Sequence, residues 1–273
     1  MELIEILKVV VLGIVEGVTE WLPISSTGHM LLVDEFIHMN VSESFKDMFF
    51  VVIQLGAILA VVMLFWDKMW PFQTKDKSKP VIRKDVFSMW FKVVVACIPG
   101  AIVTLLFDDY IEAHLHTPTV IALALVVYGV AFIVIENWNK NRTPKVLALE
   151  DISYKTAFII GLFQVLSIIP GTSRSGSTII GALTIGVSRV AAAEFTFFLA
   201  VPVMIGLSFI KILKFGFSFT SVEFMTLAIG CVVAFLVSVL VIKFLMSYIK
   251  KRDFKIFGWY RIVLGVILLL YFM

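Results

Sequence analysis

Two acidic residues in an otherwise apolar stretch are the first sign of chemistry in this chain. Glu16 and Glu20 lie four residues apart, so a helix places both carboxylates on one face, about one turn apart. Two carboxylates this close repel each other unless a proton or a cation lies between them, and hard divalent ions prefer oxygen ligands. The pair predicts a site for Mg²⁺ or Ca²⁺. The alternative is that both side chains reach toward an interface or pair with a lysine.

A hydroxyl-rich segment with a histidine follows the acidic pair. Ser25, Ser26 and Thr27 come directly after one another, and His29 lies three residues beyond Ser26. A serine near a histidine and two acids is the arrangement of an activated nucleophile with a general acid or base. We predict Ser26 as the nucleophile and His29 as the general base. Ser25 and Thr27 then contact the substrate. Attack by His29 itself and attack by a water that Glu20 activates remain open, as does a helix cap without chemistry.

A second hydroxyl-rich segment, residues 170–178, carries a single arginine and leads into an apolar helical stretch. Backbone N–H groups at such a helix start form an anion cradle, and the guanidinium of Arg174 is suited to phosphate oxygens. We predict that Arg174 stabilises charge on a phosphate group during catalysis. The alternative is a structural arginine paired with Glu16 or Glu20. The predicted substrate contacts of this segment are Gly171, Thr172, Ser173, Arg174, Ser175, Gly176 and Thr178.

Composition indicates where these segments lie. Hydrophobic residues make up 60% of the 273 residues and charged residues 16%, against about 45–50% and about 25% in soluble proteins. A mean hydropathy of +1.01 and 25 phenylalanines exclude a soluble enzyme, a disordered chain and a secreted disulfide scaffold. The net charge of +3 does not indicate nucleic acid, because the basic residues lie in short loops. The sequence predicts an all-α polytopic membrane protein.

Six apolar runs are long enough to cross a bilayer, which takes about 20 residues each. They cover residues 48–66, 86–107, 119–136, 191–210, 222–246 and 256–272. Two further apolar stretches, 3–22 and 157–170, are interrupted by charges or are too short, and each stops at a proline. We predict that both are re-entrant helical hairpins, since irregular backbone at membrane depth is tolerated only beside protein or water.

Loop charges alternate as six crossings require. Loops 67–85, 137–156 and 247–255 carry six, four and four Lys and Arg residues. Loops 34–47, 108–118 and 211–221 carry one, none and two. The first three loops are therefore predicted to be cytoplasmic.

The two interrupted stretches resemble each other. Gly13 and Gly161 lie 148 residues apart, the prolines Pro23 and Pro170 lie 147 apart, and three crossings follow each. An odd number of crossings between them predicts two inverted-topology repeats, 1–136 and 157–273, joined by a cytoplasmic linker, 137–156, within one membrane domain, 1–273. The hairpin tips then meet near the midplane, and the site opens to the outer side.

Other polar and aromatic residues carry weaker expectations. Gln54 lies in a crossing helix, where it contacts substrate in the cavity or makes a helix–helix hydrogen bond. We expect Arg189 and Glu194 to pair with each other near an interface. Trp21 is expected to face lipid, as tryptophans in membrane proteins commonly do.

The motifs resemble the bacitracin-resistance type of undecaprenyl-diphosphatase. Its (E/Q)-x-x-x-E signature matches residues 16–20, P-x-S-S-T-G-H matches 23–29, P-G-x-S-R-S-G-x-T matches 170–178, and S-R-x-x-A-x-E-F matches 188–195. The resemblance implies a multi-pass enzyme of the bacterial plasma membrane that removes the terminal phosphate of undecaprenyl diphosphate with a divalent cation. It also implies recycling of the lipid carrier for peptidoglycan synthesis, bacitracin resistance, and a homodimer. The rival function is a secondary transporter or flippase for an anionic lipid substrate.

Overall fold

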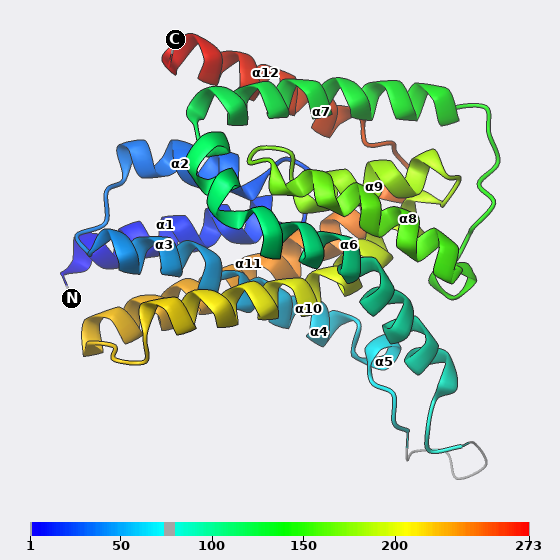
Figure 1. The fold of residues 1–273 in the computed structure, drawn as a ribbon, viewed down its shortest axis with the longest axis horizontal. Helices are drawn as coiled ribbons and strands as arrows, with labels where there is room; N and C mark the ends of the chain where they lie inside the picture. Colours follow the sequence, from blue (N-terminus) through cyan, green and yellow to red (C-terminus); the bar gives the residue numbers. More distant parts are fainter. Residues whose placement is uncertain (1, 74–79, 273) are drawn as a thin grey trace.

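Helices form nearly all of the regular structure in the part of the chain that the computed structural model describes, residues 2–73 and 80–272 (Figure 1). Lys75, Lys77 and Lys79, which count toward the charge of loop 67–85, lie outside the described residues. The α-helices are α1 Leu3–Thr19, α2 Ser26–Phe36, α3 Glu43–Val52, α4 Gln54–Leu64, α5 Trp66–Met69, α6 Lys84–Leu115, α7 Pro118–Asn139, α8 Tyr154–Val165, α9 Arg174–Thr184, α10 Arg189–Phe215, α11 Ser221–Ile249 and α12 Lys255–Phe272. Two short 3-10 helices are η1 Leu149–Asp151 and η2 Leu166–Ile168.

The six expected crossings are confirmed as helices long and apolar enough to span a membrane. They are Glu43–Leu64, Lys84–Phe107, Pro118–Asn139, Arg189–Phe215, Ser221–Ile249 and Lys255–Phe272. The first of them is interrupted at Ile53, between α3 and α4, and the second continues as α6 to Leu115.

Local sequence explains where several of these helices begin and end. Ser188 and Thr220 cap α10 and α11, accepting hydrogen bonds from the backbone N–H groups three residues further on. Pro118 occupies the first turn of α7, where its missing N–H costs nothing. Gly216, with φ of 98°, ends α10 in a conformation that favours glycine.

The connections divide between the two ends of the molecule (Figure 1). The described residues that flank the α5–α6 connection lie at one end, together with the Lys- and Arg-rich connections α7–α8 and α11–α12. The connections α2–α3, α6–α7 and α10–α11 lie at the other end, with both chain termini. This is the arrangement that the alternation of loop charges predicts.

The two interrupted stretches each fold as a helix, a turn and a second helix. The first turn, residues 20–25, joins α1 to α2, and the second turn, residues 169–173, follows α8 and η2 and leads into α9. Both turns end in a serine with positive φ, Ser25 at 76° and Ser173 at 71°. Each of these serines accepts a hydrogen bond from the N–H of a glycine three residues later. The two turns therefore share one local structure 148 residues apart, while membrane insertion as hairpins and the inverted repeats stay predictions.

Close backbone packing holds both interrupted stretches against crossing helices. The first helix of each, α1 and α8, packs on α11 and α6 respectively. Gly13 and Gly161 lie at these contacts, where an added Cβ would collide with Val233 or with the backbone of Ala96. The helices α7 and α12 pack side by side along their length.

Two expectations about side chains are wrong. Trp21 is fully buried and packs edge-to-face on Phe197, because it follows Glu20 into the packed interior rather than facing lipid. Arg189 and Glu194 do not pair with each other. Arg189 binds Glu136 of α7, and Glu194 accepts two hydrogen bonds from Lys68 of α5.

Candidate active site

The two turns meet through an ion pair between their motifs. The guanidinium of Arg174, at the start of α9, donates to Glu20 Oε1 at 3.0 Å, and both side chains are nearly buried. Ser175 adds a second link by donating its hydroxyl to the backbone oxygen of Glu20 at 3.3 Å. Acidic and hydroxyl-rich segments that are 154 residues apart in the chain thus form one cluster. The pairing is also the structural role that the sequence left open for Arg174.

The candidate nucleophile contacts the same carboxylate. Ser26 Oγ donates to Glu20 Oε2 at 2.8 Å, so the Ser26 hydroxyl already has a proton acceptor in reach. Ser25 beside it is buried and caps α2 through the N–H of Gly28. The capping role that the sequence left open is therefore real for Ser25, while Ser26 faces Glu20 instead.

The guanidinium of Arg174 is fixed from two sides. One terminal nitrogen contacts Glu20 and the other donates to the backbone oxygen of Thr196 in α10 at 3.0 Å. The buried Nε–H of Arg174 has no hydrogen-bond partner among the residues that the structure describes. An oriented guanidinium with one unused donor at a helix N-terminus is suited to bind an oxyanion.

The remaining hydroxyls of the second motif serve mostly to hold its shape. Thr172 donates to the backbone oxygens of η2 and the second turn, at Leu166 and Ile169. Thr178 contacts the hydroxyl of Thr196 at 2.9 Å. Gly171 has φ of 92°, and a Cβ there would lie 2.5 Å from the backbone oxygen of Ile121. These residues shape the turn around Arg174, and their contact with substrate stays a prediction.

Ser173 and Gly176 form the N-terminus of α9 together with Arg174 and Ser175. Ser173 Oγ lies 3.0 Å from Ser175 Oγ and accepts from the N–H of Gly176. A Cβ on Gly176 would come within 3.3 Å of the Arg261 guanidinium and of Ser173 Cβ. A larger residue at position 176 would require the guanidinium or the Ser173 side chain to shift by a few tenths of an ångström.

His29 is turned toward α12. Its Nδ1–H donates to the backbone oxygen of Ser25 at 2.7 Å, which leaves Nε2 as an acceptor for the Tyr260 hydroxyl at 2.6 Å. The two rings are parallel with centroids 5.6 Å apart. Both ring nitrogens of His29 are thus occupied, and the proton acceptor that contacts Ser26 is Glu20.

A cavity of about 460 Å³ opens beside this cluster, and we call it the Glu16 cavity. Its lining includes Glu16, Ser26, Thr27 and Gln54, while substrate contact by Gln54 stays a prediction. Glu16 is 1% exposed, and within the described part of the chain its Oε1 has no hydrogen-bond partner. A buried carboxylate oxygen left free beside a second carboxylate fits a hard cation that takes its other ligands from water or substrate. Among the residues described, no cluster of three or more His, Cys, Asp or Glu occurs, and the cation site stays a prediction.

Arg261 of α12 is a site residue that the sequence reasoning missed. It is 0% exposed and donates to the backbone oxygen of Pro23 in the first turn at 3.1 Å. It also donates to the oxygens of Gly171 and Thr172 in the second turn at 2.7 and 2.9 Å. An arginine within an apolar crossing helix was the available signal, because ionisable residues inside a membrane are seldom without a role.

Known proteins resemble this chain over nearly its whole length. The family model described as bacitracin resistance protein BacA matches residues 9–267. A protein of Enterococcus faecalis named undecaprenyl-diphosphatase is 74% identical over 270 residues, which cover 99% of this chain and 98% of that protein. Proteins of the same name from Lachnoclostridium phytofermentans and Desulfitobacterium hafniense are each 62% identical over 273 residues, covering all of this chain and 99% and 98% of their own lengths. The chain therefore belongs to the bacitracin resistance protein BacA family.

Proposed function

We propose that this chain is an undecaprenyl-diphosphate phosphatase, which cleaves the phosphoanhydride bond of the lipid to give undecaprenyl phosphate and inorganic phosphate. Relatives that carry the name undecaprenyl-diphosphatase align with essentially the whole chain. The observation in the structure that carries the proposal is the contact of Glu20 with both Ser26 and Arg174, which joins a nucleophile, a base and a phosphate ligand. Recycling of the lipid carrier for cell-wall synthesis and resistance to bacitracin follow from membership in the family.

The diphosphate enters through the Glu16 cavity and lies between the N-termini of α2 and α9. Both helix starts favour a negative charge, and Arg174 supplies a fixed positive one. The prenyl chain stays in lipid, since about 0.8 kcal/mol is lost for each CH₂ moved from an apolar environment into water.

The chemical step is a phosphoryl transfer to Ser26. Its oxygen attacks the terminal phosphorus while the hydroxyl proton passes to Glu20, and the bond between phosphorus and the bridging oxygen breaks. Undecaprenyl phosphate leaves, and water then releases inorganic phosphate from the serine. Arg174 stabilises the charge on the transferred group throughout. The hydrogen bond from Ser26 favours Glu20 over His29 as the base in this step, and direct attack by His29 or by water stays an alternative.

Glu16 and Glu20 would hold the divalent cation, Mg²⁺ or Ca²⁺. When bound, the ion neutralises charge on the phosphate oxygens. The free oxygen of Glu16 and the oxygen chemistry of the pair support this assignment.

The arrangement in the membrane is also part of the proposal. The basic end of the molecule faces the cytoplasm of the bacterial plasma membrane, and the Glu16 cavity opens on the outer side. The two interrupted stretches are re-entrant hairpins in inverted repeats, as the shared conformation of Ser25 and Ser173 supports. A homodimer, which the resemblance to the family implies, is the last part of the proposal.

Phosphate release by purified protein in detergent tests the function. The enzyme releases inorganic phosphate from undecaprenyl diphosphate without a membrane gradient, whereas a secondary transporter or flippase does not. We expect Arg174→Ala, Glu20→Ala and Ser26→Ala each to lower the rate at least about 100-fold, the loss of roughly 3 kcal/mol of transition-state stabilisation. A folded Arg174→Ala variant with a near-normal rate would exclude the assigned phosphate ligand.

A further inference from the structure

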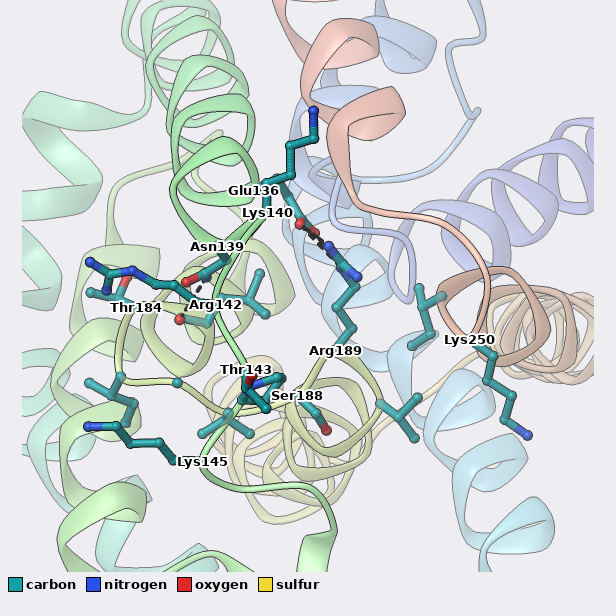
Figure 2. A pocket seen from close by; sticks show the side chains of 17 residues that line it. Glu136, Asn139, Lys140, Arg142, Thr143, Lys145, Thr184, Ser188, Arg189 and Lys250 are labelled. Atoms are coloured by element: carbon teal, nitrogen blue, oxygen red, sulfur yellow. Dashed lines mark hydrogen bonds and ion pairs between the residues drawn. The ribbon is translucent and has the colours of Figure 1, made fainter.

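A second cavity, of about 550 Å³, lies at the end of the molecule that carries the basic loops (Figure 2). We call it the basic cavity. It is formed by the end of α7, the segment 140–145, the turn between α9 and α10, and the end of α11. None of the predicted catalytic residues lines it. Its volume lies within the range of about 300–1,000 Å³ that small-ligand sites occupy.

Positive charge dominates the lining of this cavity. One carboxylate, that of Glu136, faces five basic side chains, those of Lys140, Arg142, Lys145, Arg189 and Lys250. Glu136 is already engaged, because it accepts from the guanidinium of Arg189 at 2.9 and 3.1 Å and from the N–H of Phe254 at 3.0 Å. In the described residues Lys140, Lys145 and Lys250 make no ion pair. The lining therefore has a positive charge that the protein itself does not neutralise.

The basic side chains surround the opening on several sides. Figure 2 shows Arg142 and Lys145 extending on one side and Lys250 on the other, with Arg189 held by Glu136 between them. Arg142 is also placed by the ring of Trp138, whose centroid lies 3.7 Å from its guanidinium carbon. A cation held on an aromatic ring keeps its hydrogen-bond donors available for another ligand.

The wall of the basic cavity is fixed by backbone hydrogen bonds. The N–H groups of Lys145 and Val146 both donate to the oxygen of Gly186, at 2.8 and 3.2 Å, and the N–H of Ser188 donates to Val146 at 2.8 Å. Gly186 has φ of 84°, which favours glycine at this turn. Asn139 ties the end of α7 to the oxygen of Leu183 in α9 at 3.0 Å. The cavity is thus formed before any ligand binds.

The rest of the lining combines polar side chains, those of Asn139, Thr143, Thr184 and Ser188, with an apolar wall. Ile185, Val190 and Ile249 face the same space as the basic side chains. A free anion would gain nothing from such a wall, whereas a headgroup attached to acyl chains would cover it. Basic pockets between the ends of membrane helices on the cytoplasmic side are characteristic sites for anionic lipid headgroups. We propose that the basic cavity binds the phosphate-bearing headgroup of an anionic phospholipid.

Binding of short-chain lipids to the full chain tests this proposal. The protein in uncharged detergent is titrated with dioctanoyl phosphatidylglycerol, dioctanoyl phosphatidylcholine or glycerol 3-phosphate, and bound ligand is counted by native mass spectrometry. The variant lacking three cavity charges combines Arg142→Gln, Lys145→Gln and Lys250→Gln. The matched control removes three charges near the same end but outside the cavity lining, through Lys155→Gln, Lys251→Gln and Arg252→Gln.

We expect phosphatidylglycerol to bind at least about tenfold more tightly than phosphatidylcholine, since each basic contact contributes several-fold in affinity. The cavity variant should lose at least about tenfold of that affinity and the control less than about threefold. Both variants should release phosphate from undecaprenyl diphosphate normally, which shows that they are folded. An equal loss of phosphatidylglycerol affinity in the two variants would show that binding depends only on the total charge of the loops, and this result would overturn the proposal. Equal binding of phosphatidylcholine, or binding of glycerol 3-phosphate as tight as that of the lipid, would also overturn it.

Discussion

Replacing Arg261 by methionine removes a side chain that binds both turns of the candidate active site at once. The guanidinium makes three hydrogen bonds to backbone oxygens, one in the first turn and two in the second. Bonds of this charged type contribute about 1.5–3 kcal/mol each, so their lower limit is about 4.5 kcal/mol in total. Burying the guanidinium costs several kcal/mol, and no carboxylate contacts it within the described chain. Because the two effects largely offset each other, we expect the melting temperature of Arg261→Met to change by only about 2–4 °C.

Activity should respond far more strongly than stability. Without Arg261 the backbone oxygens of Pro23, Gly171 and Thr172 lose their shared donor, and the two turns lose one of the links that fix the distance between Ser26 and Arg174. A displacement of about 1 Å between reacting groups lowers a rate about 100-fold, which is the loss in kcat/KM that we expect.

Phosphate release and thermal unfolding are measured on Arg261→Met, on Arg261→Lys and on Arg252→Met, an exposed arginine that serves as control. The lysine variant should recover only part of the activity, because one ammonium group cannot reproduce the planar fork that reaches both turns. A folded Arg261→Met protein within threefold of the normal kcat/KM would refute the reasoning. So would a melting temperature far below normal combined with an unchanged rate.

Three further perturbations have expected outcomes. Glu16→Gln should weaken the apparent affinity for Mg²⁺ at least about tenfold, because one of two charged ligands is lost. A magnesium titration of phosphate release measures this affinity, and an unchanged midpoint would show that Glu16 is not a metal ligand. Gly171→Ala should lower the free energy of unfolding by about 2 kcal/mol or more, because its Cβ meets Ile121 and its φ is positive; denaturant unfolding measures it. Tyr260→Phe should lower kcat by less than about tenfold with little change in KM, because His29 keeps its hydrogen bond to the backbone but loses the Tyr260 hydroxyl. Steady-state kinetics measure both constants, and full activity would show that the contact between His29 and Tyr260 has no role.

The crossing helices could be predicted from the sequence because burial in lipid leaves long apolar runs. The limits of α7 and α12 came within three residues of prediction, since capping residues and loop charges mark the ends of such runs. The similarity of the two interrupted stretches, each followed by three crossings, also predicted that their turns meet, and the contact between Glu20 and Arg174 agrees with that prediction.

Side-chain partners across helices could not be predicted in the same way. Arg189 and Glu194 are five residues apart, which places them on different faces of α10, and each therefore meets another helix. The burial of Trp21 depends on Phe197, far away in the chain. The partner of Ser26 was ambiguous because His29 and Glu20 are both near it in sequence, and only the turn geometry directs the hydroxyl to Glu20.

The ion pair between Glu20 and Arg174 also has a consequence for biosynthesis. The ribosome adds Arg174 only after another 153 residues have followed Glu20, so the acidic half of the centre reaches the bilayer well before its basic half. During that interval the nascent chain keeps carboxylates in or near lipid, at roughly 2.5–3.5 kcal/mol for each one that is charged at mid-depth. The contact between Glu20 and Arg174 therefore forms late in translation, and a polypeptide released before residue 174 lacks it.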